Sequence, residues 1–163
     1  MTDKIFLGLG GNLGHPLDYF KGVRRQLSDH PCIILNASSP VYRTPAVGGP
    51  AGQPDYLTAV LEVSTELTPP QLLAVCLEIE LAAGRTRDIR WEARILDIDL
   101  LFFGQMVSDD PRLTLPHPRL QNRHFALLPL VDLDPELQHP RLGLTVSALL
   151  NKLPEPVGVR KVS

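Results

Sequence analysis

The segment from Gly84 to Phe103 constrains the chain most, because it sets charged residues against a strongly apolar stretch. In its second part, residues 95–103, two acids (Asp97 and Asp99) interrupt a run of Ile, Leu and Phe. Such an apolar run predicts a buried strand. Side chains alternate along a strand, so both carboxylates would lie on one face, about 6.6 to 7 Å apart along the chain. Burying two acids there is costly unless a cation sits beside them.

The first part of this segment supplies charge of the opposite sign. Guanidinium groups bind phosphate in a bidentate manner, and Mg²⁺ is usually held by one or two carboxylates together with substrate phosphates. The segment therefore predicts a site for a metal-bridged polyphosphate. Strict alternation would turn Arg94 away from Asp97, so the pattern requires a bend or a strand that starts after Arg94. The arginines are Arg85, Arg87, Arg90 and Arg94, and the chain's only tryptophan, Trp91, lies among them.

Two simpler explanations compete with the phosphate site. A D-x-D pair is often a strand end with solvated acids, and four arginines in one connection are often a solvated loop. The adjacency of the two groups favours the phosphate site, because each supplies the charge that the other lacks. A Mg²⁺-dependent phosphoesterase or a non-catalytic binding module could use the same residues.

Composition narrows the functional class. A chain of 163 residues is long enough for one domain over residues 1–163. The net charge of −2 argues against nucleic acid as a partner. The sequence has no signal peptide and no apolar run of membrane-span length. Two cysteines, Cys32 and Cys76, suggest reduced thiols. We expect a cytoplasmic monomer.

The predicted elements alternate in a familiar order. In chain order they are a strand at 4–9, a helix at 16–29, strands at 32–39 and 56–67, a helix from the Thr68 N-cap to Gly84, and the acidic strand. Short helices follow at 125–133 and 145–150, and the last residues form a frayed tail. This βαββαβ order predicts an α+β, ferredoxin-like fold: an antiparallel sheet with helices packed on one face and a C-terminal helical extension.

Alternation in the strand from Tyr56 gives that residue and Thr58 the same face. On the open face of the sheet, these two side chains could gather with Asp97 and Asp99. The loop at 40–55 is rich in glycine and proline and longer than most connections. It could present backbone groups to a planar ligand, and a plain surface loop explains it equally well.

Other candidate residues flank these elements. Glu80 borders the buried side of its predicted helix, where it could hold a ligand or an arginine, or be an ordinary helix glutamate. His117 lies between prolines and is therefore expected in a loop. His117 and Arg123 add phosphate-binding groups, and Phe125 adds a flat ring.

Seven motifs make the chain resemble a known family. The resemblance covers residues 6–150 and is to 6-hydroxymethyl-7,8-dihydropterin pyrophosphokinase, which transfers the pyrophosphate of ATP to the hydroxymethyl group of the dihydropterin during folate synthesis. The most specific motif is R-W-x-x-R-x-L-D-I-D-L with a later P-H-P. In chain order the motifs are G-G-N-L-G, Y-R-T-P, Q-P-D-Y-L, I-E-L-x-x-G-R, R-W-x-x-R-x-L-D-I-D-L, L-x-L-P-H-P and N-R-x-F.

The resemblance also implies roles for individual residues. It implies ATP and the dihydropterin as substrates and two Mg²⁺ ions held by Asp97 and Asp99. The family's asparagine that hydrogen-bonds the pterin is replaced here by Thr58, and Glu92-Ala93 follow Trp91 where Gly-Pro is common. The implied catalytic residues are Arg85, Arg94, Asp97 and Asp99; the implied ATP contacts are Glu80, Arg87, Trp91, Arg112, His117 and Arg123; the implied pterin contacts are Thr44, Pro45, Val47, Tyr56, Thr58 and Phe125.

Overall fold

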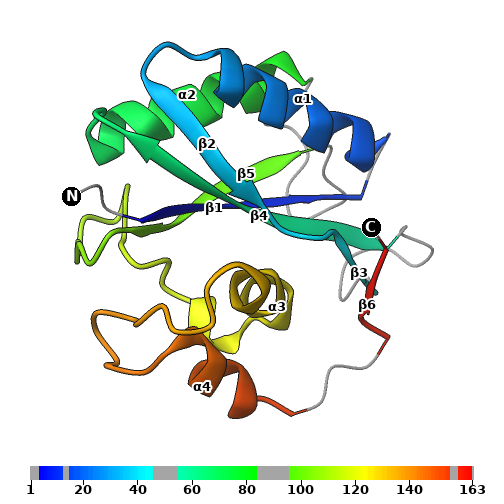
Figure 1. Ribbon diagram of the computed structural model, residues 1–163, viewed down its shortest axis with the longest axis vertical. Helices are drawn as coiled ribbons and strands as arrows, with labels where there is room; N and C mark the ends of the chain where they lie inside the picture. Colours follow the sequence, from blue (N-terminus) through cyan, green and yellow to red (C-terminus); the bar gives the residue numbers. More distant parts are fainter. Residues whose placement is uncertain (1–3, 13–14, 46–54, 84–95, 155–157, 163) are drawn as a thin grey trace.

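The structure, a computed structural model, describes residues 4–12, 15–45, 55–83, 96–154 and 158–162. It is a mixed α/β fold built on an antiparallel sheet (Figure 1). The strands are β1 (Ile5–Gly11), β2 (Ile33–Ser38), β3 (Tyr42–Thr44), β4 (Tyr56–Thr65), β5 (Asp97–Phe103) and β6 (Arg160–Lys161). The helices are α1 (Pro16–Asp29), α2 (Pro69–Ala82), α3 (His124–Leu133) and α4 (Val146–Asn151), with a 3₁₀ turn, η1 (Leu120–Asn122).

The long strand β4 organises the sheet. The strands follow the order β5-β1-β4-β3-β6, and β2 also pairs with β4. β2 pairs with the second half of β4, residues 61–65, whereas β3 pairs with its first residues, 56–58. One edge of β4 thus holds two short strands in succession.

Helices lie on both faces of the sheet (Figure 1): α1 and α2 on one, α3 and α4 on the other. Alternate strand residues separate into two cores. On the α1–α2 face, Leu7 and Leu9 of β1 join a buried cluster with Phe20. On the α3–α4 face, Phe6 packs edge-on against Phe102, with ring centroids 6.3 Å apart. The prediction of helices on one face therefore holds for α1 and α2 alone.

Local signals place the two long helices where the sequence predicts them. α1 begins at Pro16, and its buried stripe is Phe20, Val23 and Leu27. α2 begins with a capping box in which the Thr68 hydroxyl accepts from the backbone N–H of Gln71, while the Gln71 side chain accepts from that of Thr68. α2 ends at Ala82, and the predicted stop at Gly84 lies outside the described residues.

A β-bulge divides β5 into two parts, and the alternation of side chains between the two faces of the sheet shifts by one residue at the bulge. The register pairs Phe6 with Phe102 and Leu7 with Leu100, so Leu101 is an extra residue on β5. Before the bulge, Ile98 and Leu100 turn to the α1–α2 core. At and after it, Leu101 and Phe102 both pack into the α3–α4 core. The strand starts after residue 94, as the predicted position of Arg94 requires.

Two short strands correct the sequence prediction. Residues 42–44 form β3 inside the segment predicted as loop, and residues 160–161 form β6 inside the predicted frayed tail. Each is too short for a recognisable alternation pattern, and each depends on pairing with distant residues. The predicted helices at 125–133 and 145–150 are confirmed as α3 and α4, with Thr145 as the N-cap of α4. Over the described part of the chain, no helix has the length and apolar character needed to cross a bilayer.

Candidate active site

A cavity of about 650 Å³ opens on the α3–α4 face, between the sheet and the start of α3. Strands β1, β3, β4 and β5 contribute to its walls. Together with the start of α3 and Val159, six segments of the sequence therefore meet in one concave site, as is typical of ligand pockets. The residues predicted from sequence that line it are Thr44, Pro45, Tyr56, Thr58, Asp97, Asp99, Arg123 and Phe125.

One wall of the cavity carries the two acids. Asp97 pairs with Gly10 and Asp99 with Gly8 across the β1–β5 ladder, and all four residues line the cavity. The prediction that both carboxylates share a face is confirmed. Because the paired residues are glycines, no side chain crowds the acids from β1. A Cβ at Gly10 would meet no atom closer than 3.9 Å, whereas one at Gly8 would lie 3.2 Å from the Leu101 side chain, so the floor is open at Gly10.

The acidic pair fits a magnesium site that a ligand completes. Within the described ranges, no group of three or more His, Cys, Asp or Glu side chains could hold a metal ion by itself. Two carboxylates are the usual protein share of a Mg²⁺ site whose other ligands are water and substrate phosphates. The donor set of Asp97 and Asp99 therefore suits a metal that arrives with a polyphosphate.

The hydroxyl of Thr58 marks a polar point on the otherwise apolar floor. Thr58 is 7 % exposed, and its buried Oγ1 has no hydrogen-bond partner. Buried polar atoms are nearly always paired, and an unpaired one costs free energy. Since Thr58 lines the cavity, a bound ligand could provide the missing partner.

Two aromatic rings and one guanidinium stand at the rim. Tyr56, at the start of β4, pairs with Thr44 of β3, and Phe125 lies in the first turn of α3. Arg123, the N-cap of α3, holds its guanidinium carbon 5.3 Å from the centroid of the Phe125 ring. A cation at this distance is attracted to the ring face. The rim thus presents both flat apolar surface and positive charge.

His117 holds its loop against the bulge of β5. Its backbone N–H donates to the carbonyl of Leu101 at 3.0 Å. Burial lowers the pKa of the His117 imidazole, the charges of Arg123 and Arg119 lower it further, and Asp99 opposes them. The ring therefore favours its neutral form at pH 7.

Glu80 supports the acidic strand from behind. It is 3 % exposed on α2, and its Oε2 accepts from the backbone N–H of Ile98 at 2.6 Å. Ile98 lies between Asp97 and Asp99, with its side chain in the α1–α2 core. Glu80 is thus on the opposite face of the sheet from the cavity and contacts the backbone that carries the acids.

A protein-family model described as 7,8-dihydro-6-hydroxymethylpterin-pyrophosphokinase matches residues 6–135. This chain belongs to that family. Several proteins named 2-amino-4-hydroxy-6-hydroxymethyldihydropteridine pyrophosphokinase are similar to it. The one from Methylorubrum extorquens is 42% identical over 160 residues, covering 98% of both chains. The one from Pseudomonas aeruginosa is 40% identical over 140 residues, covering 86% of both chains.

Solved structures agree on the fold. The wild-type Plasmodium falciparum HPPK-DHPS crystallised with STZ-DHP is similar with a TM-score of 0.72 at 17% identity. The match covers 93% of this chain and 43% of that one. At this identity the likeness concerns the fold alone.

Not every residue implied by the resemblance to the pyrophosphokinase family reaches the cavity. Arg112 lies elsewhere: it is paired with Asp110 at 3.2 Å and lines a separate groove beside α2. His117 and Glu80 do not line the cavity and act on β5, as described above. The remaining predicted residues lie outside the described part of the chain: Val47, Arg85, Arg87, Trp91 and Arg94.

The cavity also includes residues that sequence reasoning missed. Gly8 and Gly10 form the floor beside the acids, and His124 and Val159 contribute to the walls. The glycines had a usable signal, because they alternate in an apolar strand and so share one face. Val159 had none, since only the pairing of β6 with β3 brings it there.

Proposed function

We propose that this chain transfers the pyrophosphate of ATP to the hydroxymethyl group of 6-hydroxymethyl-7,8-dihydropterin, giving AMP and the pterin diphosphate, a step of folate biosynthesis. One observation carries the proposal. In a member of this family, an acidic pair on a glycine floor shares a cavity with two aromatic rings and an unpaired buried hydroxyl.

Asp97 and Asp99 are proposed to hold two Mg²⁺ ions on the phosphates of ATP. Bound metal would neutralise phosphate charge and lower the pKa of the attacking hydroxyl. The open space over Gly10, which pairs with Asp97, supports this role, because a phosphate chain needs room next to the carboxylates.

The pterin is proposed to lie between the rings of Tyr56 and Phe125. Thr58 would then pair its hydroxyl with a polar atom of the ligand, which removes the cost of the unpaired group. The backbone of Thr44, Pro45 and Val47 would recognise the edge of the ring, as the resemblance implies. Thr44 and Pro45 line the same cavity, which supports their part of this assignment.

The nucleotide side is proposed to rely on arginines. Arg85 and Arg94 would clamp the phosphates during transfer, and Arg87 and Trp91 would complete the same loop over the nucleotide. Arg123 lines the cavity, which supports its role as a phosphate contact. The roles proposed for the other four residues are supported by the resemblance to the family: Arg85, Arg87, Trp91 and Arg94.

Three further assignments differ in their support. His117 does not line the cavity, and its role as an ATP contact is supported by the resemblance. Glu80 would act by fixing the Ile98 backbone between the metal ligands. Arg112, paired with Asp110, is supported by the resemblance alone.

In phosphoryl-type transfer, the protein contributes mainly by positioning the reactants and stabilising charge. The proposed roles fit that demand, since none of them requires a strong protein base. The arginine loop would exclude water and so protect ATP from hydrolysis.

The chain is further proposed to act as one domain, 1–163, in the cytoplasm as a monomer. The order β1-α1-β2-β4-α2-β5 and the sheet order β5-β1-β4-β2 support a ferredoxin-like core with a C-terminal helical extension. The free thiols of Cys32 and Cys76 suit a reducing compartment.

An AMP-release assay tests the function. ATP, Mg²⁺ and reduced hydroxymethylpterin are supplied together and then omitted one at a time. We expect AMP and pterin diphosphate only when all three are present. Release of inorganic phosphate without pterin diphosphate would identify a phosphoesterase instead, and absence of turnover with Mg²⁺-dependent ATP binding would indicate a binding module.

A further inference from the structure

The C-terminal strand reaches the candidate active site from the far end of the sequence. β6 pairs antiparallel with β3 through Tyr42 with Lys161 and Arg43 with Arg160. The N–H of Val162 donates to the carbonyl of Val41 at 2.8 Å. Val159, immediately before β6, lines the same cavity as the metal-site acids.

Gly158 brings this segment close to the rim of the cavity. Its φ of +76° lies in the left-handed region, which glycine adopts without strain. A Cβ at this position would lie 2.8 Å from Cγ of Pro45, too close for any side chain. The backbone at 158 therefore packs directly on Pro45, which also lines the cavity.

The register links β6 to the acidic wall by a single row across the sheet. Gly10 pairs with Asp97 on one side and with Thr58 on the other. Thr58 pairs in turn with Tyr42, and Tyr42 with Lys161. Paired residues share a face of the sheet. The row thus runs from a candidate metal ligand, across the cavity floor, to β6.

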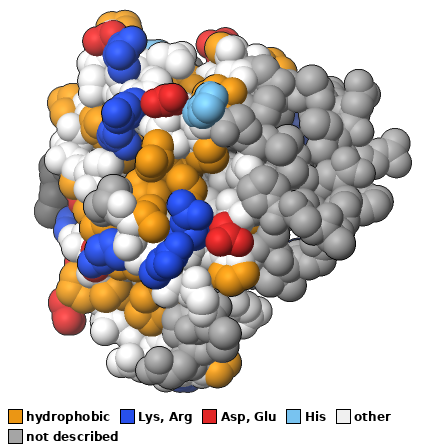
Figure 2. All heavy atoms as spheres, turned by 90° about the vertical axis from the view of Figure 1, so that its right-hand side faces the viewer, with side chains coloured by type: hydrophobic (Ala, Val, Ile, Leu, Met, Phe, Trp, Pro, Cys, Tyr) orange, Lys and Arg blue, Asp and Glu red, His pale blue; other side chains and the backbone are white. Residues whose placement is uncertain are grey.

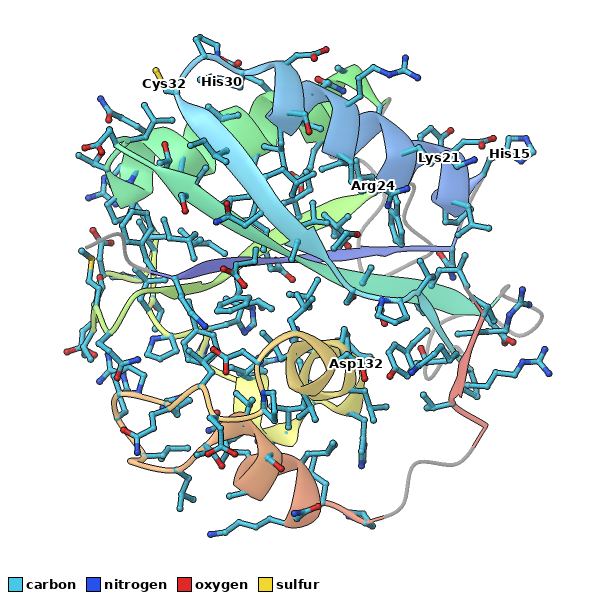
Figure 3. The ribbon with its side chains drawn as sticks, in the orientation of Figure 1. His15, Lys21, Arg24, His30, Cys32 and Asp132 are labelled. Atoms are coloured by element: carbon cyan, nitrogen blue, oxygen red, sulfur yellow. The ribbon has the colours of Figure 1, made fainter. Side chains whose placement is uncertain are left out.

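Three side chains fasten the far end of this row to α3. The Tyr42 hydroxyl donates to Oδ2 of Asp132, and Nζ of Lys161 lies 3.8 Å from the same oxygen. Nζ of Lys161 also lies 5.6 Å from the centroid of the Tyr42 ring. In Figure 3, Asp132 lies on the side of α3 that faces β3 and β6. We call Tyr42, Asp132 and Lys161 the β6 anchor.

The surroundings strengthen the β6 anchor. Tyr42, the donor of the hydrogen bond to Asp132, is 7 % exposed, and the bond is part-buried. Burial, followed by the bond to Asp132, raises the pKa of Tyr42, so the hydroxyl stays a donor at every physiological pH. Figure 2 shows the side of the molecule that carries β3 and β6, where Lys and Arg side chains gather around hydrophobic ones.

We infer that β6 is a working part of the pterin pocket: Val159 is a wall residue that determines specificity, and the β6 anchor is a positioning element that holds Val159 and Pro45 at the rim. The inference rests on the proposed function, because it names the pterin as the ligand of this cavity. It assigns β6 to pterin binding, whereas the acids proposed to hold the metal lie on β5, across the cavity floor.

The inference predicts a specific kinetic pattern. Loosening the β6 anchor moves the wall on the pterin side, so the KM for the pterin should rise about three- to tenfold. The KM for ATP and the kcat at saturating pterin should stay within about twofold, because Asp97 lies at the other end of the row and Asp99 lies two residues further along β5. Replacing Val159 by alanine should let the enzyme accept a pterin with an extra ring methyl better than the unaltered chain does.

The test compares Asp132→Asn, which weakens the β6 anchor, with the same change at Asp134, which lies outside it. A second anchor variant, Tyr42→Phe, removes the hydroxyl that donates to Asp132 and keeps the aromatic ring. Asp134→Asn is the control: Asp134 is also at the end of α3 and is paired with a lysine, Lys4 at 2.8 Å, but away from β6. Steady-state AMP release is measured for each protein with varied pterin and varied ATP, and thermal unfolding confirms folding.

Each outcome decides one question. A rise in pterin KM for Asp132→Asn and Tyr42→Phe, but not for Asp134→Asn, supports the inference. An unchanged pterin KM in both anchor variants overturns it. It is also overturned if both anchor variants lose kcat and melting temperature together with no selective rise in pterin KM, because that pattern means a merely structural role. Val159→Ala with unaltered substrate preference removes its role in specificity. If the unaltered chain forms no AMP, the proposed function itself fails.

Discussion

The two faces of the sheet are built from the same strands but differ in how completely they are filled. On the α1–α2 face, Leu7 and Leu9 of β1 and Ile98 and Leu100 of β5 are all buried in one continuous core. On the α3–α4 face, packing is complete only near Phe6 and Phe102, where α3 and α4 cover the sheet. Toward the other end of the same strands, glycines and acids line an open cavity.

The comparison shows how a strand can line an open cavity on one face of the sheet while its other face stays packed in a core. Successive residues of a strand face opposite sides, so polar or small residues can replace apolar ones on one face without touching the other core. Gly8 and Gly10 open the cavity while Leu7 and Leu9 keep β1 in place. The α1–α2 face should therefore govern stability, and the open end of the α3–α4 face should govern activity.

The largest expected effect is on activity alone. Asp97→Ala should abolish AMP formation, and Asp99→Ala should slow it by about 10³-fold or more, since each removes a proposed metal ligand. Single-turnover AMP release measures the loss, and urea unfolding should be unaffected or nearly so. Glu78→Ala, which removes an exposed acid from α2, is the control. Near-normal turnover by either aspartate variant would refute the metal role.

The converse change should affect stability alone. Leu72 of α2 is fully buried in the α1–α2 core, so Leu72→Ala should lower the free energy of unfolding by about 2 to 5 kcal/mol. Urea denaturation measures this loss. At temperatures where the variant stays folded, the KM values should match those of the unaltered chain. A selective rise in KM for either substrate would show that the two faces are not independent.

Thr58→Val tests the cavity floor with an almost isosteric change. The hydroxyl has no protein partner, so its removal should leave the free energy of unfolding unchanged or slightly higher. Pterin affinity, measured by calorimetry, should fall about five- to tenfold because the ligand loses a hydrogen bond. A clear loss of stability would mean that the hydroxyl is paired within the folded protein.

The smallest expected effect is a pH dependence of stability on the α3–α4 face. His139 is buried against Phe102, and its Nδ1 accepts from the backbone N–H groups of Arg141 and Leu142. Burial, followed by the charge of Arg141, lowers the pKa of His139 in the folded state. Between this pKa and the unfolded value of about 6.5, the unfolded chain binds more protons than the folded one.

Stability from His139 is therefore fully present above about pH 6.5 and is lost as the pH falls below it. Urea unfolding between pH 7.5 and 5 measures the slope, in a range chosen around the histidine pKa. His139→Gln should flatten the slope without removing it, because His117 has a lowered pKa for the same main reason. An identical slope in the variant would exclude His139 as a source.

The parts of the fold that the sequence predicted are those with local causes. Pro16 and the Thr68 capping box fix the starts of α1 and α2, and the D-x-D pattern in an apolar run fixes which acids share a face. The resemblance then leads to most of the cavity lining, because its motifs coincide with those elements.

The parts that the sequence could not predict depend on long-range contacts. β3 and β6 are strands only because they pair with each other and with β4, and two or three residues carry no periodic signal. The direction of Glu80 depends on how α2 meets β5, since the same helix position could face a ligand or the Ile98 backbone. Arg112 pairs with its near neighbour Asp110, and the charge of an arginine in the sequence does not show whether it pairs with a nearby acid or with a phosphate.

The hydrogen bond from Ile98 to Glu80 has a consequence for how a cation would be captured. Two like charges on one strand repel, and a flexible strand would relieve this by twisting them apart. The amide between them is pinned from the rear by a buried carboxylate at 2.6 Å, so the spacing of the pair is set before any ion arrives. Little ordering of the two carboxylates is then left to occur when a cation binds, which lowers the entropic cost of binding.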